Sequence, residues 1–215
     1  MEFERLFASN GPTLGEITLR DSEKIPESVA VIHCVGRREQ KYCSAVCCMY
    51  SFKFARFLKH KIPSVRVFNI YSDICVPGKS YQSFYRSVEG ADTEMLYTSS
   101  IGDVSVSESG SGLKVSYTDA AGSQQSLNVD MVILAAALVP DPDVASLAEI
   151  AGVDLDPQGF IKTVPDGSGS METSREGVFV AGTAEGPKDI QNSVVQAESA
   201  AGQVAEIMTS QASSS

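Results

Sequence analysis

Four of the five cysteines in this 215-residue chain lie close together, between a strand-like run and a helix-like run. Their spacing is C-x8-C-x3-C-C, at Cys34, Cys43, Cys47 and Cys48. The apolar run Val29–Ile32 precedes them, and residues 49–61 show a helical spacing of apolar side chains that ends before Pro63. The thiols therefore lie in a strand-to-helix turn, where α/β folds commonly bind a cofactor. Four thiolates can hold a [4Fe–4S] cluster or a tetrahedral zinc ion, and the spacing alone leaves both open.

Composition and charge narrow the functional classes. The chain has 43% apolar and 20% charged residues, which is ordinary for a soluble globular protein. Its formal net charge of −10 argues against nucleic acid as a partner, because phosphate binding needs a basic face. The longest apolar run, residues 131–140, is too short for a membrane span, and the charged beginning lacks the apolar core of a signal peptide. We therefore expect a cytoplasmic protein, in which clustered cysteines act as ligands more often than as disulfides.

The order of the expected elements indicates an α/β fold. After an irregular leading segment, residues 1–28, we expect strands at 29–33, 65–71 and 94–97, separated by helices at 49–61 and 80–88. Residues 101–129 alternate in polarity between glycine turns, which predicts an antiparallel β-meander. The continuous apolar run 130–138 fits a central buried strand. Residues 29–140 thus predict a Rossmann-like domain of the thioredoxin-reductase-type flavoproteins, with the cysteine loop after its first strand.

Residues 141–208 predict a second unit. We expect a short helix at 143–151, strand-like pieces at 159–163 and 177–182, and a flexible loop at 167–170. A long helix rich in alanine, valine and glutamine is expected at 189–208. The polar tail 209–215 is expected to be disordered.

Five features together resemble HdrA, the A subunit of heterodisulfide reductase, which is a flavin and iron–sulfur protein of anaerobic electron bifurcation. They are Glu2-Phe-Glu-Arg5, the cysteine loop, Gly78-Lys-x-Tyr-x-x-Phe-Tyr85, the strand at 130–140 and Gly182-x-x-x-Gly-Pro-Lys-Asp-Ile190. The resemblance covers nearly the whole chain, and the cysteine loop and Gly186–Ile190 are its most specific parts. It implies an oxidoreductase subunit that transfers electrons between FAD and a [4Fe–4S] cluster in a complex of anaerobic metabolism. It also implies that residues 141–208 are the carboxy-terminal lobe of an FAD-binding domain.

The chain departs from this family in what it lacks. It has no G-x-G-x-x-G motif for the FAD pyrophosphate and no ferredoxin-like cysteine motifs. It therefore resembles the carboxy-terminal half of a split or truncated HdrA. The resemblance implies a partner that supplies the amino-terminal half with the FAD pyrophosphate site, together with iron–sulfur subunits like HdrB and HdrC. Hydrogenase or formate dehydrogenase modules are further partners that it implies.

The resemblance assigns the metal site. It makes Cys34, Cys43, Cys47 and Cys48 the ligands of the [4Fe–4S] cluster. The nearby positive charges of Arg37, Arg38, Lys41 and Lys53 are expected to raise its reduction potential. A structural zinc knot stays open as the alternative. Cys75 is expected to be a buried apolar side chain rather than a ligand, and His33 a satisfied strand residue that could instead tune the cluster.

The resemblance also assigns an FAD site, shared with the partner chain. Its residues are Gly182, Thr183, Gly186, Pro187, Lys188, Asp189, Ile190, Ser193 and Gln196. Thr183 occupies the position where related flavoenzymes carry an aspartate for the ribityl hydroxyl. The helix that starts near Asp189 should direct its N-terminus at the flavin, and Lys188 could reach the isoalloxazine ring. A solvated Lys188 beside a simple Gly186–Pro187 turn is the alternative.

No side chain is expected to act as nucleophile or general base, because the redox chemistry belongs to the cofactors. Two other functions stay open. One is a zinc-stabilised, non-catalytic assembly module. The other is an NAD(P)H-dependent flavoprotein oxidoreductase, against which the missing dinucleotide glycines count.

Overall fold

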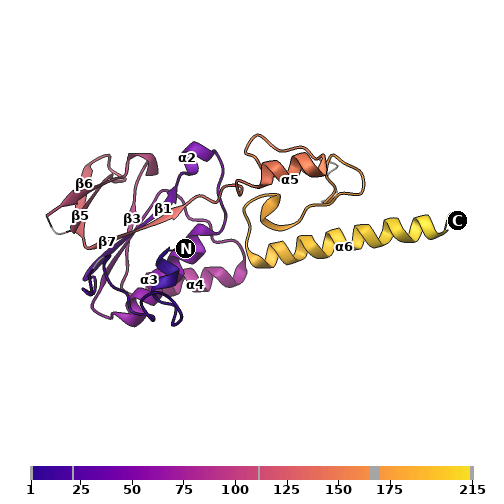
Figure 1. Cartoon of the computed structure of the whole chain (residues 1–215). Helices are drawn as coiled ribbons and strands as arrows, with labels where there is room; N and C mark the ends of the chain where they lie inside the picture. The colour runs from indigo at the N-terminus through magenta and orange to yellow at the C-terminus, as the bar shows by residue number, and fades with distance from the viewer. Residues whose placement is uncertain (1, 21, 111, 165–169, 214–215) are drawn as a thin grey trace. The chain divides into compact units, whose positions relative to one another are not determined.

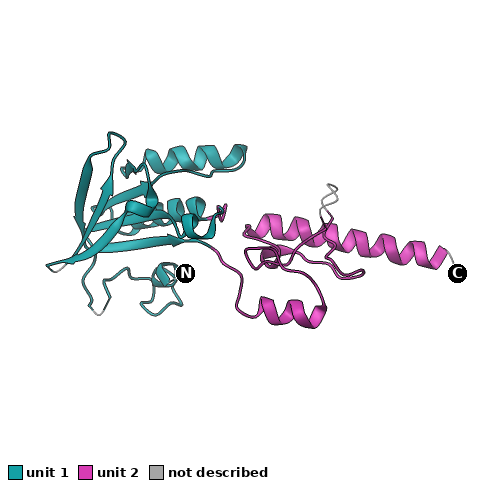
Figure 2. Ribbon diagram, turned by 90° about the horizontal axis from the view of Figure 1, so that it is seen from above, with its two compact units in different colours: residues 1–42, 47–137 teal, residues 43–46, 138–215 magenta. Residues whose placement is uncertain are grey.

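The computed structural model describes residues 2–20, 22–110, 112–164 and 170–213 (Figure 1). The chain divides into two compact units, residues 1–42 with 47–137 and residues 43–46 with 138–215 (Figure 2). The second unit begins its main stretch at Leu138, close to the boundary at 140 expected from the sequence. No helix among the described residues is long and apolar enough to cross a bilayer.

The first unit is built on a four-stranded parallel sheet in the order β3-β2-β1-β7. The strands are β1 (Ser28–Val35), β2 (Arg66–Tyr71), β3 (Glu94–Tyr97) and β7 (Met131–Ala136). Its helices are α1 (Glu2–Leu6), α2 (Arg37–Gln40), α3 (Cys47–Lys61) and α4 (Lys79–Glu89), with a 3-10 turn η1 (Ile101–Asp103). These elements confirm the expected α/β fold.

The first unit also contains a second, antiparallel sheet in the order β4-β5-β6, which packs on one face of the parallel sheet. It consists of β4 (Ser105–Ser109), β5 (Gly112–Thr118) and β6 (Gln124–Val129), which confirms the expected meander. Along β1, Val29 and Val31 pack with α3 and α4, whereas Ala30 and Ile32 pack with the meander. The alternation of the strand therefore buries both faces of the parallel sheet, one under helices and one under β-strands.

The position of β7 differs from expectation. The apolar run 130–138 predicts a central strand, but β7 lies at an edge of the described sheet, next to β1, with Leu134 55% exposed. Asp130 fixes the start of this strand, because its Oδ2 accepts hydrogen bonds from the backbone N–H groups of Glu27 and Ser28 at 2.8 and 3.0 Å. The leading segment is also more ordered than expected, since Phe3 of α1 is buried in the core.

The second unit contains α5 (Val144–Ala151), the 3-10 turn η2 (Gly182–Ala184) and α6 (Ile190–Ser213). The strand-like pieces expected at 159–163 and 177–182 form only isolated bridges, Leu155 with Ile161, Thr163 with Thr173 and Glu172 with Phe179. The helix α6 continues to Ser213, so residues 209–213 are helical and not the disordered tail that their polarity predicts. The loop expected at 167–170 lies, apart from Ser170, outside the described residues.

Candidate functional site

The cysteine loop begins where the parallel sheet changes direction. From β1 the chain adds β2 and β3 on one side and returns to place β7 on the other, so the carboxyl end of β1 is the switch point of the sheet. Ligands of open α/β sheets bind at this point. Cys34 lies there, at an irregularity in the pairing of β1 with β7 between Ile32 and Val35. Its backbone is left-handed, with φ of 57°, which is uncommon outside glycine and asparagine and redirects the side chain.

Cys47 and Cys48 are the first two residues of α3, and both are buried. Cys48 lies within hydrogen-bond reach of the thiols of both Cys34 and Cys47. The Sγ atoms of Cys34 and Cys48 also lie 3.8 and 4.0 Å from the carbonyl oxygen of Asp73. The end of β1 and the start of α3 thus bring together three of the four cysteines predicted as ligands.

The electrostatics of this group favour thiolates. A hydrogen bond from the Cys48 thiol, together with Arg37, lowers the pKa of Cys34 to about 6 despite burial. The same donor, Cys48, lowers the pKa of Cys47 to about 7. The pKa of Cys48 itself is raised, because its thiol is the hydrogen-bond donor to Cys34 and Cys47. Neighbouring thiols with lowered pKa values at a helix N-terminus are suited to a soft metal.

The loop after β2 completes the surroundings of Cys48, and sequence reasoning missed its part in the site. The backbone N–H of Cys75 lies 3.4 Å from Cys48 Sγ. Asp73 accepts a 2.7 Å hydrogen bond from Arg37, which ties this loop to the cysteine loop. The sequence signal is the position of Asp73 and Cys75 directly after the second strand, at the same sheet edge as Cys34.

Cys43 is placed differently from the other three. It lies in the segment 43–46, which groups with the second unit, and its Sγ accepts a 3.4 Å hydrogen bond from the N–H of Ala45. Ser44 accepts a hydrogen bond from the N–H of Leu138 at 2.9 Å. In the described part of the chain, no three histidine, cysteine or acidic side chains are spaced as a finished metal site. The donor chemistry of the Cys34–Cys47–Cys48 group nevertheless fits a thiolate-bound metal or cluster.

His33 precedes Cys34 but lies in the apolar core. Its side chain is fully buried, its ring lies 5.2 Å from that of Phe52, and its Nε2 is 3.3 Å from Asn69 Oδ1. Burial lowers the pKa of His33 to about 4, although the bond to Asn69 acts in the opposite direction. Its Nδ1 has no hydrogen-bond partner among the described residues, so the histidine is only partly satisfied.

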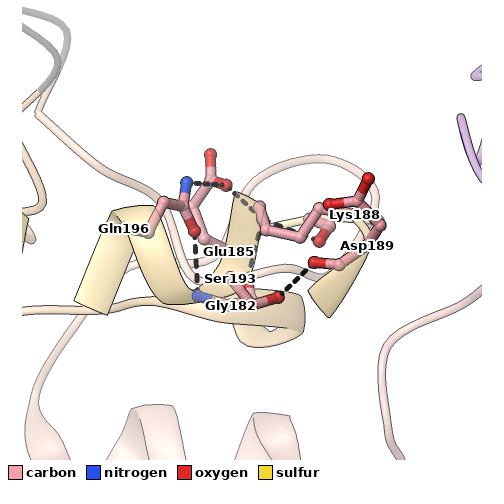
Figure 3. Close-up of polar contacts among 7 residues, drawn as sticks. Gly182, Glu185, Lys188, Asp189, Ser193 and Gln196 are labelled. Atoms are coloured by element: carbon pink, nitrogen blue, oxygen red, sulfur yellow. Dashed lines mark hydrogen bonds and ion pairs between the residues drawn. The ribbon is translucent and has the colours of Figure 1, made fainter. Parts of the chain in front are cut away.

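The second candidate group lies around the start of α6 (Figure 3). Gly182, with φ of 74°, donates its N–H to Gln196 Oε1 at 2.8 Å. Gln196 Nε2 in turn donates to Glu185 at 3.1 Å. The residues Gly182 and Gln196, predicted to act together, are therefore in contact, and Glu185 joins them as a residue that sequence reasoning missed.

Lys188 is the centre of this loop. Its ammonium group donates to the carbonyls of Gly182 and Gly186 at 2.7 and 2.8 Å and to Glu185 at 2.7 Å (Figure 3). Its side chain is only 11% exposed. Burial of Glu185 acts to raise its pKa, but Lys188 and Gln196 outweigh this and lower it. All three N–H groups of Lys188 are thus engaged within the loop, and a contact with a flavin would have to replace one of them.

The first turn of α6 is capped by Asp189. Its Oδ1 accepts the N–H of Asn192 at 2.7 Å, and its carbonyl accepts the Ser193 hydroxyl at 2.8 Å. The other predicted residues take up the rest of the turn: Thr183 is exposed in η2, Pro187 is half-buried, and Ile190 is 84% exposed. The structure therefore brings the nine predicted flavin-site residues into one loop and one helix start.

The parallel sheet, the meander and the thiols at the switch point define a Rossmann-like domain with a candidate redox centre. No protein-family model matches the chain. The fold resembles that of LpdA from Mycobacterium tuberculosis, with a TM-score of 0.54, 15% identity and coverage of 82% of this chain and 34% of that protein. This likeness supports the fold alone.

Curated proteins identify the relationship. The chain is 34% identical, over 209 residues, to the iron–sulfur A subunit of the CoB–CoM heterodisulfide reductase of Methanocaldococcus jannaschii. It is 33% identical, over 219 residues, to the A subunit of the H2:CoB–CoM heterodisulfide,ferredoxin reductase of Methanothermobacter marburgensis. Each alignment covers 95% of this chain and 32% of the relative. The chain is a homologue of HdrA, as the sequence features predicted, and it spans about a third of the length of these relatives rather than the predicted half.

Proposed function

We propose that this chain is the electron-transfer part of a heterodisulfide-reductase-like oxidoreductase, passing electrons between FAD and a [4Fe–4S] cluster. The observation that carries the proposal is the group formed by Cys34, Cys47 and Cys48 at the switch point of the sheet. Homology to reductase subunits supports the same class of activity. Flavin-based bifurcation by the whole complex is part of the proposal.

The cluster would be held by the three grouped thiolates, with Cys43 as the fourth ligand. When bound, the cluster supplies one-electron transfer. The chain contributes ligands already disposed to lose their protons, because the pKa values of Cys34 and Cys47 are lowered before any metal is present. The backbone N–H of Cys75 donates a hydrogen bond to Cys48 Sγ, and hydrogen bonds donated to ligand sulfurs raise a cluster's potential.

FAD would be held at the start of α6. The helix N-terminus there carries partial positive charge, which favours the negative charge that a flavin gains on reduction. Asp189 caps the N–H of Asn192 in this turn, which fixes the start of the helix beside the proposed flavin loop. Lys188 keeps the Gly182–Gly186 turn in shape through its three hydrogen bonds, so its first role in this proposal is to position the loop.

The remainder of the FAD site would come from outside the matched third. Without a G-x-G-x-x-G motif, this chain needs another region for the pyrophosphate, which we assign to the amino-terminal half of a split HdrA. Iron–sulfur subunits like HdrB and HdrC, and hydrogenase or formate dehydrogenase modules, are the proposed further partners in the cytoplasm. A relative from Methanococcus maripaludis that is named for H2 and formate supports this choice.

The proposal is tested by quantifying iron, sulfide and flavin in the protein purified without oxygen, with EPR of the dithionite-reduced form. We expect about four irons and four sulfides per chain and a reduced-cluster signal. Cys47→Ser should abolish the signal. Cys75→Ser is the matched control, since it removes the one cysteine that is not a proposed ligand, and it should retain the iron. Zinc without labile sulfide would replace the proposal with a structural module, and bleaching of a bound flavin by NADH alone would favour the nicotinamide-dependent alternative.

A further inference from the structure

Ser51 lies fully buried in α3, one helical turn after the pair of cysteines that begins this helix. Its hydroxyl has no hydrogen-bond partner among the described residues. A buried hydroxyl without a partner costs free energy, and such a group in a native protein commonly contacts something that the chain itself does not supply. Ser51 is therefore a candidate for contact with a bound group.

Other serines in the helices of this chain satisfy their hydroxyls locally. Ser83 and Ser87 in α4 donate to backbone carbonyls three residues earlier, at 2.8 and 2.6 Å. The same kind of bond from Ser51 would reach a carbonyl of the cysteine pair, one turn earlier, but Ser51 does not form it. Its O–H is thus not used by the backbone of its own helix.

The position of Ser51 directs its side chain toward the proposed cluster ligands. Side chains of an α-helix lean toward the N-terminus, so Ser51 covers the turn that Cys47 and Cys48 form. All three residues are buried. Cys48 also lies within hydrogen-bond reach of the thiol of Cys34 at the end of β1. The unpaired hydroxyl therefore lies beside the group of three thiols.

Two more buried polar atoms without a partner lie in the same region. They are Nδ1 of His33 and Nδ2 of Asn69, in side chains that are both fully buried. His33 directly precedes Cys34, and its ring is 3.3 Å from Asn69. Across the part of the chain that the structure describes, the unpaired buried side-chain atoms are these two and Ser51 Oγ. Their concentration near the thiols indicates a site for a bound group.

Of these atoms, the hydroxyl of Ser51 best fits the chemistry of an iron–sulfur cluster. Cluster sulfurs accept hydrogen bonds and cannot donate them. In the neutral ring of His33, Nε2 donates to Asn69 Oδ1, which leaves Nδ1 as an acceptor. Asn69 is a donor, but it lies in β2, whereas Ser51 lies in the helix that carries two of the proposed ligands.

We propose that the hydroxyl of Ser51 donates a hydrogen bond to an anionic sulfur of the cluster, either the Cys48 thiolate or a sulfide beside it. This inference rests on the proposed function, because it requires a cluster on the three thiols. A hydrogen bond to a cluster sulfur stabilises the reduced, more negative state and raises the reduction potential. Ser51 thereby sets the potential of the electron-transfer centre from within α3.

The test compares the whole chain, purified without oxygen, as wild type, Ser51→Ala and Ser51→Thr. Redox titration followed by EPR gives the potential, and pulsed ENDOR of the reduced cluster in D2O detects deuterons that are hydrogen-bonded to it. Ser51→Ala should lower the equilibrium constant for reduction about tenfold, a shift of about 59 mV to lower potential, and should lose one deuteron coupling. Ser51→Thr keeps the hydroxyl and should retain both signals.

Thr93→Val is the matched control. Thr93 is buried just before β3, at the opposite end of the sheet from Cys34, and its hydroxyl already donates to the carbonyl of Val88 at 2.9 Å. Its removal should leave the potential unchanged.

Metal-free protein gives a second readout, by equilibrium urea unfolding. Ser51→Ala removes an unpaired hydroxyl and should lower the equilibrium constant for unfolding about fivefold, whereas Thr93→Val breaks a hydrogen bond and should raise it.

The outcomes separate this proposal from the proposed function. An intact cluster with the same potential in wild type and Ser51→Ala overturns the role of Ser51 alone. Equal shifts in Ser51→Ala and Ser51→Thr do the same, because they trace the effect to packing rather than to the O–H. A metal-free Ser51→Ala protein that is less stable than wild type also overturns it, since its hydroxyl is then bonded without a cluster. Zinc without labile sulfide in the wild type overturns the proposed function, and the role of Ser51 with it.

Discussion

The burial of His33 allows a quantitative prediction of how the free energy of unfolding depends on pH. His33 is fully buried, and burial lowers its pKa from 6.5 to about 4. The unfolded chain binds a proton below pH 6.5, whereas the folded chain resists protonation until about pH 4, so unfolding becomes more favourable as the pH falls. The stability that the neutral histidine provides is therefore present above pH 6.5 and lost on the way down to pH 4.

The size of the effect follows from the two pKa values. Across the whole interval the first unit should lose roughly 3 kcal/mol of its free energy of unfolding, and between pH 7 and pH 5 about 2 kcal/mol. His33→Gln removes this titration while keeping a group that can bond to Asn69. The variant can be less stable than the wild type at every pH. Between pH 7 and pH 5, however, its free energy of unfolding should fall by about 2 kcal/mol less than that of the wild type.

The measurement is equilibrium urea unfolding of metal-free, reduced protein at several pH values, followed by circular dichroism because the chain has no tryptophan. Groups that titrate in both proteins cancel in the difference between the two curves. His60→Gln, which removes the exposed histidine near the end of α3, is the control and should follow the wild-type curve. Parallel curves for the wild type and His33→Gln between pH 7 and pH 5 would refute the reasoning.

Three further outcomes follow from single contacts. Phe52→Ala should lower the free energy of unfolding by about 3–5 kcal/mol in the same urea assay, because Phe52 is fully buried. Asp130→Asn should cost about 1–2 kcal/mol at pH 7, because its carboxylate accepts several hydrogen bonds; its lowered pKa means that the cost should vanish in strong acid. Lys188→Met should raise amide exchange in the 182–189 loop about tenfold, measured by mass spectrometry, because it removes three hydrogen bonds within the loop, one of them to the half-buried Glu185.

Each of these outcomes has a control. Phe57 lies on the same helix and is 37% exposed, so Phe57→Ala should lower the free energy of unfolding clearly less than Phe52→Ala does. An equal loss in the two variants would contradict the assigned core. A cost of Asp130→Asn that persists at pH 2 would show that the carboxylate's charge is not responsible. Lys162→Met removes an exposed lysine of the same unit and should leave loop exchange unchanged.

The parallel sheet was predictable from sequence because its strands are short apolar runs separated by amphipathic helices. The meander was predictable because alternation and glycine turns are local signals. The edge position of β7 was not, since the start of its apolar run packs on both faces, Met131 and Ile133 with the helices and Val132 with the meander. A strand covered on both faces is apolar throughout, wherever it stands in the sheet order.

The candidate sites divide in the same way. The meeting of Cys34, Cys47 and Cys48 could be predicted, because a strand end and the following helix start are brought together by the fold. The approach of Asp73 and Cys75 depends on pairing between β1 and β2, a relation that single-residue spacing does not express. The three bonds of Lys188 were hidden for another reason: its acceptors are mostly backbone carbonyls, which every sequence contains.

The pairing of β1 with β7 has a consequence for how the chain is made. Val29 of β1 pairs with Met131 of β7. The sheet that carries the cysteine loop is therefore completed by residues that leave the ribosome long after the cysteines do. Closing so distant a contact carries an entropic cost, so this pairing forms later than the local helices. A nascent chain that ends before β7 would therefore present its thiols on an unfinished sheet. Cluster loading is expected to follow release of the first unit, and truncations before residue 131 should accumulate without iron.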